Sequence, residues 1–136
     1  MNKAQISLEF LVILVAMIAI LIVFLPVFSK LEKSVLLTLD VYNASKYLNE
    51  FKADVSMLNT LETGSSFVFN IKFIYSAKFS CEENILKFVL GNDVKSKVLS
   101  TELAMNCDFS YDIKKNANFL VTKESSNDLN IFVLSN

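Results

Sequence analysis

The chain begins with a long uncharged apolar run. Residues 10–29 contain no charged side chain, and the acid Glu9 stands directly before them. A helix over such a run rises about 30 Å, the thickness of the hydrocarbon core of a bilayer. The pattern therefore predicts a membrane-spanning helix. A carboxylate at its edge costs free energy unless it has a partner, so Glu9 either lies among lipid headgroups without a role or forms half of a pair.

The helical pattern continues beyond the apolar run. Pro26, the only proline, removes one helical hydrogen bond and crowds the preceding turn, so we expect a kink near it, with a helix end at the membrane exit as the alternative. Apolar residues resume after Pro26 at three- and four-residue steps, which predicts one stripe of an amphipathic helix over 30–63. Gly64 suits the position just after the helix. The stripe residues are Phe28, Leu31, Val35, Leu39, Tyr42, Leu48, Phe51, Val55 and Leu58.

After Gly64 the apolar period changes to two, which is typical of strands with one buried face. Gly91-Asn92-Asp93 suits a hairpin loop. We expect an antiparallel sheet of four to six strands over 64–136, packed on the C-terminal half of the long helix, because a small sheet needs a second layer to bury its face. The fold class is therefore predicted as α+β. The predicted strands cover 67–79, 85–90, 94–100, 106–113, 119–123 and 129–134.

The apolar run does not read as a cleaved secretory signal peptide. Such a peptide has a shorter apolar stretch and a small-residue cleavage site after it, for which Pro26-Val27-Phe28-Ser29 is a poor substitute. We therefore expect the segment to be retained. Lys3 before the run predicts a cytoplasmic N-terminus and an external C-terminal domain, although Lys30 and Lys33 argue weakly for the opposite orientation.

Composition narrows the function classes. The net charge is -1 and all 13 basic residues are lysines, so we expect no nucleic-acid partner. Without histidine, two cysteines cannot complete a four-ligand metal site, and we expect no metal and no cofactor. No Gly-x-Ser-x-Gly or Ser-x-x-Lys string is present, and Glu82-Glu83 reads better as two solvated acids than as a catalytic pair. We expect no enzymatic activity.

Two covalent features belong to the domain that we expect outside the cell. Cys81 and Cys107 can form a disulfide there, with two buried free thiols as the alternative. Asn43-Ala44-Ser45 is the one glycosylation sequon, although a position on a helix makes Asn43 less accessible.

The N-terminal residues resemble a known family. The segment 3–14, Lys-Ala-Gln-Ile-Ser-Leu-Glu-Phe-Leu-Val-Ile-Leu, is similar to the start of archaeal type IV pilin-like proteins with a class III signal peptide. In that family a short basic leader precedes Gln-x-Ser-x-Glu, here Gln5, Ser7 and Glu9, and then an apolar stretch. The family often has Leu four residues after the Glu, where this chain has Ile13.

The resemblance implies a processing step and a set of partners. A prepilin peptidase would cut between Ala4 and Gln5, which removes the leader 1–4 and leaves 5–29 as an apolar helix in the membrane. It also implies a type IV pilin-like fold, with other pilin subunits and the pilus assembly machinery as partners. Gln5, Ser7 and Glu9 would then act in assembly, where Glu9 of one subunit can meet the new Gln5 amine of another.

Three functions remain open from the sequence. The first is a structural subunit of an archaeal type IV pilus-like surface filament, stored in the membrane and extracellular when assembled. The second is a minor pilin or adhesin-like binding module on the same anchor. The third is a membrane-anchored protein that does not polymerise. The leader motif favours the first two, and the absence of an obvious binding cluster in the sequence favours the first.

Overall fold

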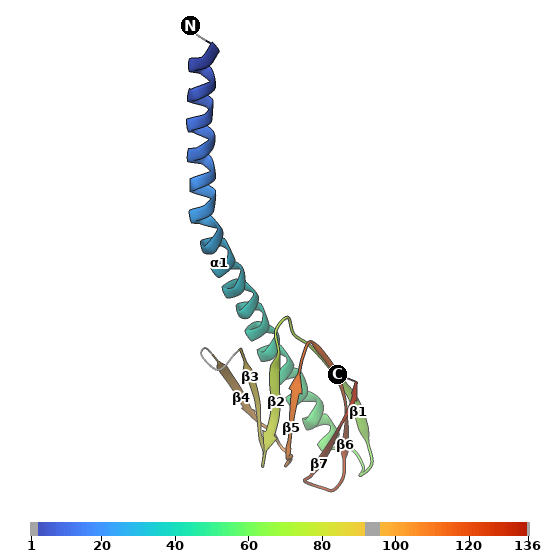
Figure 1. Cartoon of the computed structure of the whole chain (residues 1–136). Coiled ribbons are helices and arrows are strands. Elements are labelled where there is room, and N and C mark those ends of the chain that lie inside the picture. Colours follow the sequence, from blue (N-terminus) through green and yellow to red (C-terminus); the bar gives the residue numbers. More distant parts are fainter. Residues whose placement is uncertain (1–2, 92–95, 136) are drawn as a thin grey trace. The chain divides into compact units, whose positions relative to one another are not determined.

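The computed structural model describes residues 3–91 and 96–135. These described residues form one helix followed by seven strands (Figure 1). Their bounds are α1 Lys3–Asn59, β1 Ser66–Lys72, β2 Ala77–Glu82, β3 Ile85–Leu90, β4 Lys97–Glu102, β5 Phe109–Ile113, β6 Asn116–Lys123 and β7 Leu129–Ser135. The chain divides into two compact units, residues 1–35 and 36–136. The first contains the N-terminal part of α1, and the second contains the rest of α1 with all seven strands.

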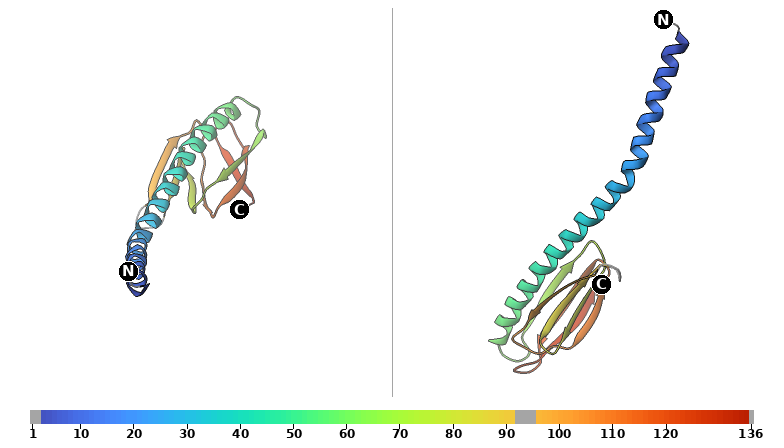
Figure 2. Two further views of the ribbon diagram at one scale, coloured as in Figure 1. Left: turned by 90° about the horizontal axis from the view of Figure 1, so that it is seen from above. Right: turned by 90° about the vertical axis from the view of Figure 1, so that its left-hand side faces the viewer.

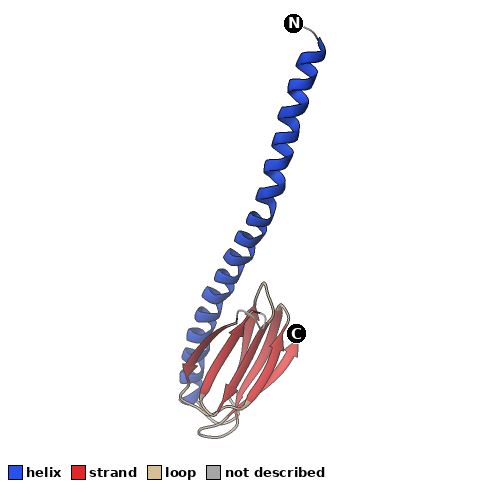
Figure 3. Cartoon of the chain, turned by 60° about the vertical axis from the view of Figure 1, so that its left-hand side comes forward, coloured by secondary structure: helices blue, strands red, loops and turns tan. Residues whose placement is uncertain are grey.

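The strands of the second unit form two antiparallel sheets. One has the strand order β1-β6-β7 and the other has the order β4-β3-β2-β5. The strands of both sheets lie side by side (Figure 3). In the described part of the chain, a parallel bridge between Asn106 and Asp128 joins them at the ends that β5 and β7 share. The Tyr111 hydroxyl also donates a hydrogen bond to the Ile131 carbonyl, 2.9 Å away.

The second half of α1 covers one face of both sheets (Figure 2). Phe51 on the helix is fully buried and contacts Phe69 of the first sheet, with ring centroids 5.0 Å apart, and Phe79 of the second, 5.8 Å apart. Phe79 stacks on Phe88 at 4.6 Å and contacts Phe119 at 5.3 Å. Phenylalanine supplies much buried area and favourable edge contacts, so these rings hold the helix and both sheets in one core. The predicted α+β class and antiparallel pairing are confirmed.

The prediction of one apolar stripe along the helix is wrong. Leu48, Phe51, Val55 and Leu58 are at most 5 % exposed and face the sheets, whereas Leu39 and Tyr42 are 47 % and 69 % exposed. Each residue turns the helix by about 100°, so the nine steps from Leu39 to Leu48 amount to about two and a half turns and move the apolar position to the opposite side. The stripe residues of the second unit therefore lie on two opposite sides of α1. Continued apolar spacing hid this change of side.

The prediction of one strand over 67–79 is also wrong, because a turn at 73–76 divides it into β1 and β2. The fully buried Asp40 carboxylate on α1 accepts the N–H groups of Ile74 and Tyr75, at 2.9 and 2.8 Å. Phe73 at the start of the turn and Ala77 after it are both buried, so alternation passes through the turn without a break. This division raises the number of described strands from the predicted six to seven. β5 and β7 are not paired along their lengths, so the strands form two sheets instead of the predicted one.

The helix ends at Asn59 rather than at residue 63. The N–H groups of Thr60 and Leu61 bond to carbonyls three residues earlier, which closes the last turn. The ammonium group of Lys123 on β6 then donates to the carbonyls of Asn59, at 2.9 Å, and Leu61, at 2.7 Å. Lys123 is only 6 % exposed, and its charge opposes the negative end of the helix dipole.

Gly64 does not occupy the position just after the helix, which ends at Asn59, but its backbone has the positive φ that favours glycine. Its φ is +92°, a region that side chains disfavour, and its N–H donates to the backbone carbonyl of Lys123. The predicted strand 85–90 is confirmed as β3. The predicted hairpin loop falls largely outside the described residues, since Asn92 and Asp93 are not among them.

Candidate functional site

The leader motif lies at the start of α1. Ala4, Gln5 and Ser7 belong to the helical backbone of the first unit. Glu9 follows one helical turn after Gln5, and its side chain is exposed. The helical register thus places the N-terminus that cleavage would create and the Glu9 carboxylate on one side of the same helix.

The apolar segment after Glu9 exposes its large side chains. Between Phe10 and Phe28 their exposed fractions run from 44 % to 67 %. One helix of the described chain is long and apolar enough to cross a membrane. Exposure of this apolar surface to water is unfavourable in free energy, so we expect lipid or protein to cover it.

Pro26 lies inside this helix and does not end it. It has no N–H to donate to the Ile22 carbonyl. Three residues later, the Ser29 hydroxyl donates to the Leu25 carbonyl at 3.2 Å, a bond from a serine to the fourth residue before it. Such bonds often accompany bent helices. The helix end proposed as the alternative at Pro26 is wrong, and the kink stays a prediction.

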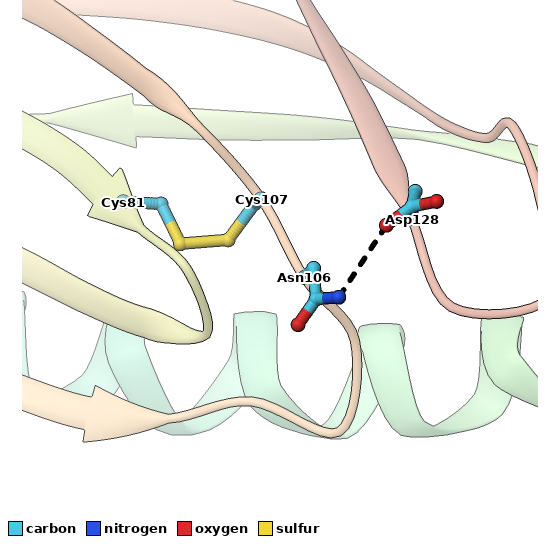
Figure 4. The surroundings of a disulfide bond; sticks show 4 residues. All are labelled: Cys81, Asn106, Cys107 and Asp128. Atoms are coloured by element: carbon cyan, nitrogen blue, oxygen red, sulfur yellow. Dashed lines mark hydrogen bonds between the residues drawn. A yellow bond between two sulfur atoms is a disulfide. The ribbon is translucent and has the colours of Figure 1, made fainter.

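The two cysteines are brought together in the second unit. Cys81 on β2 and Cys107 before β5 form a disulfide, with their Cα atoms 5.7 Å apart (Figure 4). Next to it, the Asn106 side-chain amide donates to the Asp128 carboxylate at 3.4 Å, and the N–H of Leu129 donates to the Asn106 carbonyl. The disulfide therefore fastens the chain at the point where the two sheets meet.

A polar pocket of about 740 Å³ opens beside the disulfide. Its lining includes four acids and two asparagines: Glu82, Glu83, Asp108, Asp128, Asn84 and Asn106. In the described ranges, no group of three acid, cysteine or histidine side chains is placed to hold a metal ion. Glu82 and Glu83, considered as a pair from the sequence, are both in this lining.

The outward side of α1 becomes polar after Tyr42. The Lys46 ammonium and the Glu50 carboxylate form an exposed ion pair at 3.5 Å. Partial burial raises the pKa of Asp54 above its ordinary value, and the nearby Glu50 carboxylate raises it further.

Asn43 of the sequon is half-buried on this helix, and the following residue, Ala44, is fully buried. Glycosylation of Asn43 stays a prediction.

The sequence analysis did not identify two buried charged residues, Asp40 and Lys123, that connect the helix to the strands. Asp40 precedes Ala44 and Leu48 by four and eight residues, so its place on the sheet-facing side could have been read from helical spacing. Lys123 follows Phe119 and Val121 at alternate positions of a strand, which gives it an inward direction. Each charge breaks an apolar pattern, and each binds backbone groups of another element.

Comparison with known proteins bears on the N-terminal segment. The family described as class III signal peptide matches residues 2–28. The search of curated proteins and the search of solved structures find no match to this chain. The matched segment contains the whole leader motif and most of the exposed apolar helix, and a helix packed on antiparallel sheets follows it. The match therefore supports a type IV pilin-like protein with a class III signal peptide.

Proposed function

We propose that this chain is a structural subunit of an archaeal type IV pilus-like surface filament. The observation that carries the proposal is the class III signal peptide at residues 2–28, which continues into an apolar helix with exposed side chains. A signal of this class implies processing by a prepilin peptidase and transfer to pilus assembly machinery. The function is that of a building block, without catalysis and without a cofactor.

Cleavage between Ala4 and Gln5 prepares the subunit for assembly. It removes Lys3 and creates an α-amino group on Gln5, which is protonated at neutral pH because such groups have a pKa of about 8. The apolar helix stays attached at the new N-terminus. The subunit is held in the membrane with its N-terminus in the cytoplasm and its sheets outside, where a disulfide between Cys81 and Cys107 persists.

Glu9 sets the register between subunits. When helices leave the lipid and pack together, the Glu9 carboxylate of one subunit pairs with the Gln5 amine of another. A shifted helix would leave two charges unpaired in an apolar bundle, which costs far more than an imperfect apolar contact. The same apolar side chains thus contact lipid in the stored subunit and other helices in the filament.

N-terminal sequencing and a Glu9→Gln variant test the proposal. The full chain should start at Gln5 when recovered from sheared surface filaments and should dominate them by mass. Glu9→Gln should reach the membrane at the normal level but give few filaments, whereas Glu50→Gln, which changes an exposed acid of the same helix, should assemble normally. An intact Met1 would indicate a simple membrane tether. Recovery of only traces of the chain in the filaments would indicate a minor subunit. Normal filaments from Glu9→Gln would show that Glu9 does not set the register between subunits.

A further inference from the structure

β1 is the outer strand of the three-stranded sheet (Figure 1). In an antiparallel strand, alternate residues direct their backbone N–H and carbonyl groups toward the same neighbour. The Ser65 carbonyl, just before β1, accepts the N–H of Lys123. Just after β1, the N–H of Phe73 donates to the Lys115 carbonyl, so the odd-numbered residues bond to β6 and its extensions. The even-numbered residues therefore direct their backbone groups away from the sheet, and they are Ser66, Val68, Asn70 and Lys72.

Tyr47 of α1 closes this edge at one end. Its hydroxyl accepts the N–H of Lys72 at 3.2 Å and donates to the carbonyl of the same residue at 3.3 Å. Both backbone groups of Lys72 thus face away from β6, as the alternation requires. In the part of the chain that the structure describes, the backbone groups of Ser66, Val68 and Asn70 have no partner on this side. We call these three residues the open edge.

The open edge lacks the features that usually protect an unpaired strand. Proteins block such strands with charged side chains, proline or a bulge, because a free edge is a template for another strand. The open edge is uncharged, and Lys72, the one charge on β1, lies at the end that Tyr47 closes. By contrast β4, the outer strand of the other sheet, carries exposed charges at both ends, Lys97 and Glu102. β1 is therefore the better template for a further strand.

A groove of about 240 Å³ lies beside the open edge. Its lining is Asp54, Met57, Leu58 and Leu61 on one side and residues 66–68 of β1 on the other. Met57 and Leu61 are 67 % and 44 % exposed, so apolar surface in the groove is open to solvent. A strand added to β1 directs every second side chain to the helix-covered face of the sheet, where the groove lies. An apolar side chain at such a position is removed from water there.

Asp54 gives the groove a charge preference. Within the described ranges its carboxylate forms no ion pair. Partial burial and the nearby Glu50 carboxylate both disfavour its charged form. The buried Lys123 ammonium does not compensate it, because this group bonds to the carbonyls of Asn59 and Leu61. A cation brought beside Asp54 would offset both penalties.

We propose that the open edge binds an extended peptide segment of another protein, which adds to β1 as a further strand, places an apolar side chain in the groove and a lysine or arginine beside Asp54. An extended main chain presents donors and acceptors at the spacing of the open edge. On the outer face, Val68, Leu120 and Phe132 lie directly across from one another, so an apolar residue next to Val68 continues this row. The inference uses the second unit alone and does not depend on the proposed function.

Fluorescence anisotropy with the full chain in lipid nanodiscs tests this proposal. The probe is an acetylated, fluorescein-labelled peptide, Thr-Val-Leu-Val-Lys-Val-Thr. Val68→Pro removes an outward N–H but no bond to β6, and proline is tolerated at such edge positions. Val98→Pro is the matched control: Val98 is 60 % exposed on β4, and the bond from the Leu103 N–H to the Asn84 carbonyl shows that even-numbered residues of β4 also face outward. Circular dichroism checks that both variants fold.

We expect Val68→Pro to weaken binding about tenfold or more, since it removes a backbone hydrogen bond and blocks the edge, and Val98→Pro to bind as wild type does. Asp54→Asn should weaken binding several-fold, but not that of a peptide with norleucine in place of lysine. No binding of the probe to wild type, or equal weakening by the two proline variants, would overturn the inference. An equal effect of Asp54→Asn on both peptides would refute the charge preference.

Methylated peptides keep the test decisive if Val68→Pro does not fold. Only one alternate set of amides in an added strand faces β1. With the wild-type chain, N-methylation of one alternate set in the probe should therefore weaken binding about tenfold or more, and methylation of the other set should leave it within about twofold. Equal effects of the two sets would overturn strand addition.

Discussion

Replacing Asp40 by alanine should destabilise the domain more than any other single change of an acid on α1. The carboxylate is fully buried and accepts two backbone N–H groups, from Ile74 at 2.9 Å and Tyr75 at 2.8 Å. These bonds attach the helix to the turn that separates β1 from β2. Asp40→Ala leaves both part-buried donors without their acceptor.

The size of the effect follows from the two orphaned donors. A buried N–H that loses its partner costs about 1–3 kcal/mol, so two cost about 2–6 kcal/mol. Three terms reduce this sum: the two N–H groups are only part-buried, alanine avoids burying a charge, and alanine is a better helix former than aspartate by about 0.5 kcal/mol. The free energy of unfolding should therefore fall by about 2–4 kcal/mol, a large share of the 5–15 kcal/mol typical of a domain.

Urea unfolding of the full chain in detergent micelles, followed by circular dichroism with the disulfide intact, measures this change. Asp54→Ala is the matched control, because Asp54 is an exposed aspartate of the same helix and gives the same gain in helix propensity. Hydrogen exchange at the amides of Ile74 and Tyr75 should accelerate in Asp40→Ala and stay unchanged in the control. Equal stabilities of the two variants, within about 0.5 kcal/mol, would refute the role of Asp40.

Three further predictions concern the rest of the domain. Lys123→Met keeps the alkyl packing but removes the ammonium from the carbonyls at the end of α1, and should cost about 1–3 kcal/mol of unfolding free energy. Reduction of the disulfide between Cys81 and Cys107, 26 residues apart, should cost about 3–4 kcal/mol in the chain-entropy model, measured by unfolding with and without reductant. Asp54→Asn should stabilise the domain at neutral pH by no more than about 0.5 kcal/mol, because the group is exposed. Its raised pKa means that the fold favours the neutral carboxyl, so wild-type stability falls as pH rises through that pKa, and the advantage of the variant should vanish below the ordinary pKa.

Each of these predictions has a control in the same chain. Lys78→Met changes an exposed lysine on β2 and should stay within about 0.5 kcal/mol of wild type, so an equal loss in both lysine variants would contradict the cap on α1. A chain with alanine at Cys81 and Cys107 should show no response to reductant. For Asp54, an advantage that grows as the pH falls would have the wrong sign for a raised pKa.

The sequence predicts the layers of this fold better than its connections. Apolar spacing identifies the long helix, the strand 85–90 and the inward residues of the sheets, because side-chain burial follows the helical and strand periods directly. It does not locate the turn at 73–76, whose N–H groups bond to Asp40, 34 residues before Ile74 along the chain. Nor does it predict two sheets. The division depends on the lack of backbone pairing between β5 and β7, and apolar spacing does not report which strands pair. The leader motif could be identified from the sequence because its residues are adjacent along the chain and do not depend on the fold.

The apolar residues of α1 in the second unit divide between two sides of the helix. Leu48, Phe51, Val55 and Leu58 face the sheets and supply the layer that buries Phe79 and Phe119. Leu39 and Tyr42 precede them and are exposed, so a substitution at either position should leave the core unchanged. The change of side between Tyr42 and Leu48 therefore separates the helix residues that the fold needs from those that it does not.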